Sequence, residues 1–226
     1  MAVCGQAFIP DKNTSGDNLY GPRICNQEFI DWAWDAHSFD GDYWDEGFGY
    51  EDVCNTDLPL ARTLNAIWLL NYSASSYWLE DYSLSILQWG CRYVREQIVN
   101  LRAACGDGSA IATTFLDSDV RLELYKGCFY SKDVPGRAET LVHESRHFGG
   151  KPHDAKFPTP SVFGAGKDGA DSTWEYEGAW MFGALYLWWF YAEGTRTTSA
   201  LRQAAKQRAN LVIDNAFATH PGFTIA

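Results

Sequence analysis

Hydrophobic side chains recur at helical spacing in one long segment of the chain. Between Asp81 and Cys105 the apolar positions follow each other at intervals of three or four residues, which places them on one face of an α-helix: Leu84, Leu87, Cys91, Val94, Ile98 and Leu101. The stretch Gly106-Asp107-Gly108 follows, and glycine at that place is typical of a helix C-terminus. The pattern predicts a helix over Asp81–Cys105 with one buried face.

Two segments after this helix have the pattern of β-strands. Ala110–Leu116 is apolar and rich in β-branched residues, and Val120–Tyr130 begins with alternating apolar and polar positions. Lys132–Gly136 contains a proline and predicts a turn, and Arg137–His147 predicts a helix that Gly149 and Gly150 stop. Further helices are predicted over Asn26–His37, Pro59–Tyr72, Ser172–Ala192 and Thr197–Ala218.

These elements predict an α+β fold that is mainly helical, with a small sheet before the helix over residues 137–147. The length of 226 residues and a hydrophobic content of 46% suit one large domain with a sizeable core. Residues 1–25 are rich in Gly, Pro, Asn and Asp, and they predict an irregular N-terminal arm on a single domain over residues 1–226.

The charge of the chain excludes some partners. The formal net charge is -11, whereas nucleic acids and anionic membranes attract basic surfaces. The most apolar run, Trp180–Ala192, is too short to cross a bilayer and predicts a buried core helix. We therefore expect no nucleic-acid partner and no membrane span.

The six cysteines favour an oxidising compartment. Their number is even and no C-x-x-C pair occurs, so up to three disulfides fit better than a zinc ribbon, although six reduced and buried thiols are the alternative. Cys4 and Cys25 are candidates for a bond that holds the N-terminal arm. We expect a secreted or extracellular protein, and because the chain begins without a basic and apolar leader, its signal peptide would have been removed or lie outside this sequence.

The chemistry of the chain concentrates in residues 143–153, which read HESRHFGGKPH. In a helix, His143 and His147 lie four residues apart on one face and can offer two imidazoles to one metal ion. Glu144 lies beside that face and can act as general base on a water molecule. Gly150 lets the chain turn off the helix, so that His153 can return as a third ligand and leave one position of a tetrahedral zinc open.

These residues match the pattern H-E-x-x-H-x-x-G-x-x-H and resemble the metzincin group of zincin metallopeptidases. The resemblance implies Zn²⁺ bound by His143, His147 and His153, with Glu144 as the base that assists hydrolysis of peptide bonds. It also implies a zincin-like fold, with a sheet before the active-site helix and a long helix behind it. The expected substrate is a peptide or protein, and the expected activity is that of a metalloendopeptidase.

A second resemblance is to the deuterolysin-like peptidases, on the segments Leu124–Tyr130 and Arg137–His147. That family implies an aspartate as third ligand, here Asp154 or Asp171, and a tyrosine that stabilises the oxyanion, here Tyr176. A gluzincin-like arrangement would instead take Glu175 or Glu177 as the third ligand.

Two functions of other classes stay open from the sequence. The aromatic and acidic N-terminal region is compatible with a metal-stabilised module that binds protein or carbohydrate without cleaving it. Three histidines also suit copper or iron in a non-hydrolytic metalloenzyme. The sequence predicts neither substrate specificity nor oligomeric state.

Overall fold

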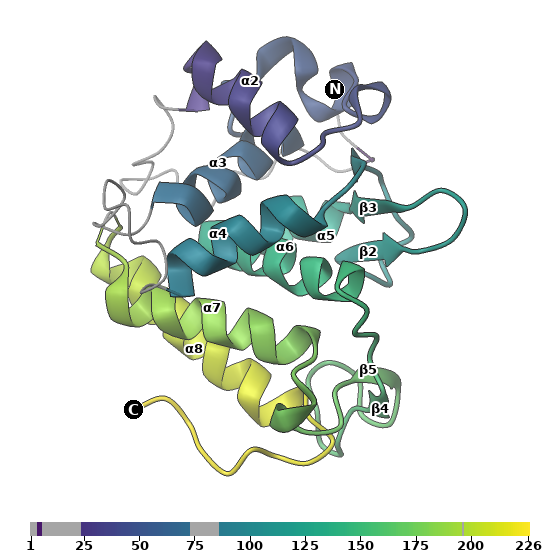
Figure 1. Cartoon of the computed structure of the whole chain (residues 1–226), viewed down its shortest axis with the longest axis vertical. Helices are drawn as coiled ribbons and strands as arrows, with labels where there is room; N and C mark the ends of the chain where they lie inside the picture. The colour runs from purple at the N-terminus through teal and green to yellow at the C-terminus, as the bar shows by residue number, and fades with distance from the viewer. Residues whose placement is uncertain (1–3, 6–23, 73–85, 196) are drawn as a thin grey trace.

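The chain folds mainly into α-helices, with two small β-sheets, so the expected α+β class is confirmed. The computed structural model describes residues 4–5, 24–72, 86–195 and 197–226 (Figure 1). The helices are α2 (Gln27–Ala36), α3 (Pro59–Tyr72), α4 (Ile86–Gln97), α5 (Lys126–Ser131), α6 (Val134–Phe148), α7 (Ala179–Glu193) and α8 (Ser199–Asn215). The strands are β1 (Leu101–Ala103), β2 (Ala112–Phe115), β3 (Arg121–Leu124), β4 (Ala155–Lys156) and β5 (Asp168–Ala170).

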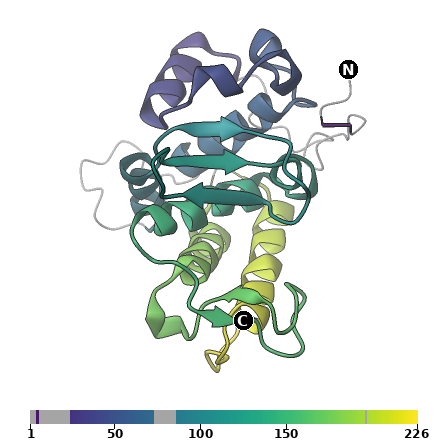
Figure 2. The same ribbon diagram turned by 90° about the vertical axis from the view of Figure 1, so that its right-hand side faces the viewer.

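The larger sheet has the strand order β1-β3-β2. Strand β1 runs parallel to β3 with Leu101 opposite Leu122, and β2 runs antiparallel to β3 with Thr114 opposite the same Leu122. Strand β2 therefore has one edge that no strand covers among the described residues. Figure 2 shows the three strands side by side, with α7 and α8 beyond the edge at which β2 lies. The expected sheet before the helix over residues 137–147 is present.

Helix α6 is the centre of the fold. Every residue from Val134 to Ser145 is buried, and the helix packs against α3, α4, α7 and β2. Its first turn is capped by Asp133, whose carboxylate accepts a hydrogen bond from the backbone N–H of Gly136. One hydrophobic cluster extends from Ile24 to Ile225, so both ends of the described chain share the same core.

The long helix predicted over Asp81–Cys105 is shorter than expected. Residues 81–85 lie outside the described residues, and α4 ends at Gln97. Asn100 then adopts a left-handed conformation with φ of 48°, and its side-chain amide donates to the carbonyl of Val120, which redirects the chain into β1. Leu87, Val94 and Ile98 are buried as the stripe predicted, and Leu101 is also buried but on a strand.

Three other boundaries differ from the predictions. The second half of Val120–Tyr130 is helix α5, not strand. The turn expected over Lys132–Gly136 is mostly the first turn of α6, because a proline just after an N-cap starts a helix. Helix α7 begins only at Ala179, since Glu177 has φ of 56° and breaks the helix expected from residue 172.

Two disulfides join distant parts of the chain. They link Cys4 to Cys105 and Cys25 to Cys54, so the expected bond between Cys4 and Cys25 is wrong. Cys91 and Cys128 carry buried free thiols. No helix in the described part of the chain has the length and apolarity to cross a membrane. Both findings are compatible with an extracellular protein.

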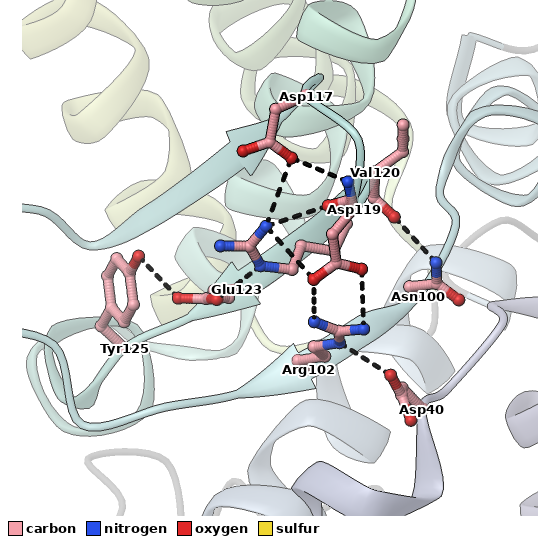
Figure 3. A network of polar contacts seen from close by, with 9 residues as sticks. Asp40, Asn100, Arg102, Asp117, Asp119, Val120, Glu123 and Tyr125 are labelled. Carbon is pink, nitrogen blue, oxygen red and sulfur yellow. Dashed lines mark hydrogen bonds and ion pairs between the residues drawn. The ribbon is translucent and has the colours of Figure 1, made fainter.

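An ion-pair network stabilises the outer face of the sheet (Figure 3). Arg102 of β1 contacts the carboxylates of Asp40 and Asp119, each at 2.7 Å. Arg121 of β3 contacts Glu123 at 2.7 Å and lies over the ring of Phe115. The connection between β2 and β3 is thereby attached to β1 and to the N-terminal part of the fold.

Candidate metal centre

Three histidines converge at the C-terminal end of α6. His143 and His147 lie one turn apart on the helix, and Gly150, with φ of 79°, reverses the chain so that His153 returns to them. Their ring centroids lie 5.1 Å (His143 to His147), 5.2 Å (His143 to His153) and 4.7 Å (His147 to His153) apart. One nitrogen from each ring lies within 4.8 Å of the other two. The predicted set of three histidines is therefore brought together.

Hydrogen bonds to the rings define which nitrogen is available. The Nδ1 of His153 lies 2.8 Å from Oδ1 of Asp171, and the Nδ1 of His147 lies 2.8 Å from the carbonyl oxygen of Lys151. Both partners are acceptors, so each Nδ1 carries a proton, and Nε2 is the nitrogen that could offer a lone pair to a metal ion. This is the arrangement in which a second contact orients a metal-binding histidine.

The rings of His143 and His147 are held in the neutral form. Burial lowers the pKa of His147 to about 4 and that of His143 well below its ordinary value. The Nδ1 of His143 is buried and has no hydrogen-bond partner among the described residues. Neutral imidazole nitrogens without protein partners are the donors that zinc takes, and nitrogens bound to one tetrahedral zinc lie roughly 3.4 Å apart. The residues present therefore fit a metal ion.

Asp171 holds the ring of His153 in place. It follows β5, its side chain is fully buried, and its second oxygen accepts from the backbone N–H of Trp180 at 3.0 Å. Its backbone bonds to Ala216 and Ala218 just after α8. Gly178 is required beside it, because a Cβ there would meet the Asp171 carboxylate. The position of His153 thus depends on contacts with α7 and with the end of α8.

Glu144 is the acidic group beside the histidines. Its side chain is 6% exposed, and its Oε2 accepts a hydrogen bond of 2.9 Å from the hydroxyl of Thr114 on β2. Burial raises the pKa of Glu144 to about 7, against the opposing effect of that hydrogen bond. A carboxylate with a pKa near neutrality is well suited to accept and return a proton.

A cavity of about 620 Å³ opens over these residues. Its lining includes the segment from Ser109 to Thr114, which contains most of β2, and the rings of Phe157, Phe163 and Trp180. Trp180 stacks on Phe163 at 4.8 Å and meets the ring of His143 edge-on at 4.5 Å. The three histidines and Glu144 line the same cavity. A ligand of the size of a few amino-acid residues has access to them.

The other candidate ligands do not join this group. Asp154 accepts a hydrogen bond from the backbone of Ser172, and Asp171 contacts His153 instead of the common centre of the three nitrogens. Glu175 and Glu177 are exposed and also lie outside the histidine group in the described structure. Among the third ligands considered from the sequence, the geometry favours His153.

Tyr176 lies near the histidines, but it is not among the described residues that line the cavity. Its hydroxyl donates to the carbonyl of Pro152 at 2.6 Å, and its own carbonyl accepts from the ammonium of Lys151 at 3.0 Å. Both contacts hold the segment that carries His153. The oxyanion role expected of Tyr176 stays a prediction, and in this structure Tyr176 holds the loop through these contacts.

Sequence reasoning missed Thr114 and the contact between Asp171 and His153. Thr114 lies 30 residues before Glu144, and only the packing of β2 on α6 brings them together. Asp171 lies 18 residues after His153 and reaches it through the pairing of β4 with β5. Neither spacing belongs to a short motif, so no sequence signal was available.

Comparison of the chain with family models, with curated proteins and with solved structures gives no match.

Proposed function

We propose that this chain is a zinc-dependent hydrolase, most closely a metalloendopeptidase. The observation that carries the proposal is the convergence of His143, His147 and His153 beside the buried carboxyl group of Glu144 in the lining of an open cavity. A purely structural zinc site has four protein ligands and needs no base, whereas a catalytic site has three and keeps one position open. The resemblance of residues 143–153 to the metzincin pattern supports the same conclusion.

His143, His147 and His153 would hold the zinc ion, which would supply Lewis-acid activation of a water molecule and of a substrate carbonyl group. Glu144 would accept one proton of that water at its carboxylate while the water oxygen bonds to the carbonyl carbon, and it would pass the proton to the amine nitrogen as the C–N bond breaks. Thr114 fixes the orientation of this carboxylate through its hydroxyl, since the 2.9 Å bond holds Oε2 toward β2. Trp180, which packs on the rings of His143 and His153, limits water access from one side.

A peptide substrate is favoured by the strand that borders the cavity. Strand β2 pairs with β3 on one edge, and its residues Ala112–Thr114 line the cavity. A free strand edge offers backbone N–H and C=O groups to an extended peptide, which can add to it as a further strand. This arrangement would align a peptide bond beside Glu144, which Thr114 of the same strand contacts.

The first experiment measures zinc content and peptide cleavage together. Wild-type protein should bind about one zinc ion per chain and cleave an unstructured protein such as casein. His147→Ala should lose the metal, whereas Glu144→Gln should keep the metal and lose cleavage, because the isosteric amide cannot accept the proton. Glu175→Gln, which alters an exposed carboxylate of the same chain, is the matched control and should keep both.

Each failure has a separate meaning. If the wild-type protein binds no metal ion, the proposal of a zinc-dependent hydrolase is refuted. Zinc without cleavage under any condition would favour the alternative of a metal-stabilised binding module. That alternative needs an exposed aromatic surface: every tryptophan side chain that the structure describes is buried or partly buried, whereas Tyr43 and Tyr50 of the N-terminal region are exposed.

A further inference from the structure

The cavity contains an ion pair that the hydrolytic steps do not use. Lys132 lies just before α6, and its ammonium contacts Oε2 of Glu139 at 2.8 Å and the hydroxyl of Thr140 at 2.7 Å. All three residues line the same cavity as His143 and Glu144. Glu139 and Thr140 are each four residues before His143 and Glu144, respectively, so they lie one helical turn away on the same face.

The accessible member of this pair is the cation. The side chain of Lys132 is 16% exposed, whereas that of Glu139 is 3% exposed. An ammonium group has three protons to donate, and the described structure gives it two acceptors. The third proton is available to a ligand in the cavity.

We propose that Lys132 binds a carboxylate of the substrate and so determines specificity at the residue next to the scissile bond. This inference rests on the proposed function. One helical turn is about 5.4 Å, which is the length of a short side chain, so a residue bound beside the metal can reach the ammonium with an aspartate or glutamate carboxylate. A free C-terminal carboxylate offers the same chemistry at a similar distance.

Glu139 and Thr140 position the ammonium. The Glu139 carboxylate lies against Gly183 of α7, where a Cβ would come within 2.6 Å of Oε1, so the packing of α6 on α7 depends on glycine at this place. Lys132 is thereby fixed on its buried side by two acceptors, and it spends little further conformational entropy when a ligand binds. Because Glu139 neutralises part of the charge, we expect a preference of about tenfold for an acidic over an amide side chain.

The test compares matched peptides on the zinc-loaded full chain. A set of peptides differs only at the positions beside the cleaved bond, with Glu or Gln there and with the C-terminus free or amidated. Mass spectrometry identifies the bond, and kcat/KM gives the ratio for each pair. Wild-type protein should prefer Glu over Gln by about tenfold in amidated peptides if side chains are the source. A preference confined to free C-termini would assign the terminal carboxylate instead, and both results support the carboxylate site.

Variants test whether the preference for a carboxylate depends on Lys132 or on the overall electrostatic potential of the protein. Lys132→Met should reduce the Glu/Gln ratio, or the ratio of free to amidated termini, to about one. Lys132→Met combined with Glu139→Gln should do the same without leaving a buried charge unpaired, in case the single variant does not fold. Lys167→Met is the matched control, because Lys167 is an exposed lysine that also lines the cavity, and its ratio should remain that of the wild type.

A binding measurement distinguishes failure of this inference from failure of the proposed function. Calorimetric titration of the zinc-loaded Glu144→Gln protein with the same peptides should show about a tenfold difference in Kd between the preferred carboxylate peptide and its amide. Cleavage or binding with no such difference, or a wild-type ratio retained in both Lys132 variants, would overturn the assignment of Lys132. Absence of cleavage together with a difference in Kd would support the carboxylate site and would refute the proposed hydrolase activity.

Discussion

Replacement of Asp171 by asparagine tests whether the carboxylate that orients His153 is needed for metal binding. Asp171 is fully buried, and its two oxygens accept one hydrogen bond from His153 and one from the backbone of Trp180. An asparagine can keep the bond from Trp180, but its amide nitrogen then faces the Nδ1 proton of His153, and two donors oppose each other. The ring of His153 must rotate, which takes its Nε2 away from the other histidines, or change tautomer, which places the proton on Nε2 and blocks the lone pair that would bind the metal.

The expected loss of zinc affinity follows from this geometry. Removal of a carboxylate that orients a metal-binding histidine weakens binding by about 10-fold to 100-fold, which corresponds to ~1.4 to ~2.7 kcal/mol. The assay is competition for zinc between the apoprotein and a chromophoric chelator, with folding monitored by circular dichroism. It reads metal affinity directly and does not depend on any enzymatic activity.

The chain contains a matched control. His220 and Asp214 form a second His–Asp contact of 3.1 Å, but both side chains are about half exposed and lie outside the histidine group in the described structure. Asp214→Asn should change zinc affinity by less than about twofold, since exposed ion pairs contribute little. If Asp171→Asn binds zinc as tightly as the wild type, His153 is not a ligand, and the three-histidine centre is refuted.

Three further predictions use other parts of the fold. Tyr176→Phe should lower zinc affinity modestly and kcat by less than about threefold, whereas loss of an oxyanion donor would cost about 100-fold in kcat, so the two readouts decide its role. Burial lowers the pKa of His37 from 6.5 to about 4, so the unfolded state binds more protons and the free energy of unfolding falls as the pH falls through that window. His37→Gln should remove about 3 kcal/mol of this fall, measured by urea denaturation between pH 7 and pH 4, and an unchanged slope would show that His37 takes up its proton as readily in the folded state as in the unfolded state. Leu87→Ala should destabilise the chain by about 2–5 kcal/mol in the same assay, since Leu87 is 1% exposed, and a loss below about 1 kcal/mol would contradict the burial of that face.

The sequence predicted those parts of the molecule that local interactions determine. Helix α3 begins and ends as expected, and the spacing of His143 and His147 on one helical face is a property of the five residues from 143 to 147. The helix predicted over Asp81–Cys105 was too long, because Ile98 and Leu101 continue the apolar spacing of the helix and are buried although they lie outside it. The left-handed Asn100, its bond to Val120 and the pairing of β1 with β3 decide for a strand, and these contacts join segments about 20 residues apart.

The remaining features depend on contacts that no short pattern records. The disulfide between Cys4 and Cys105 spans 101 residues, and six cysteines allow fifteen pairings, so pairing could not be inferred. The turn expected over Lys132–Gly136 was misread because proline both ends and begins helices, and the capping contact of Asp133 decides between these roles.

The attachment of Asp171 to the end of α8 has a consequence for biosynthesis. Asp171 donates its backbone N–H to Ala216 and accepts from Ala218, so the support under His153 is complete only when those residues are in place. A nascent chain that still lacks them presents His143 and His147 on α6 but leaves His153 without its anchor. If the three histidines hold a metal ion, its binding is therefore expected to be a late event in the maturation of the polypeptide, after the segment around residue 218 has left the ribosome.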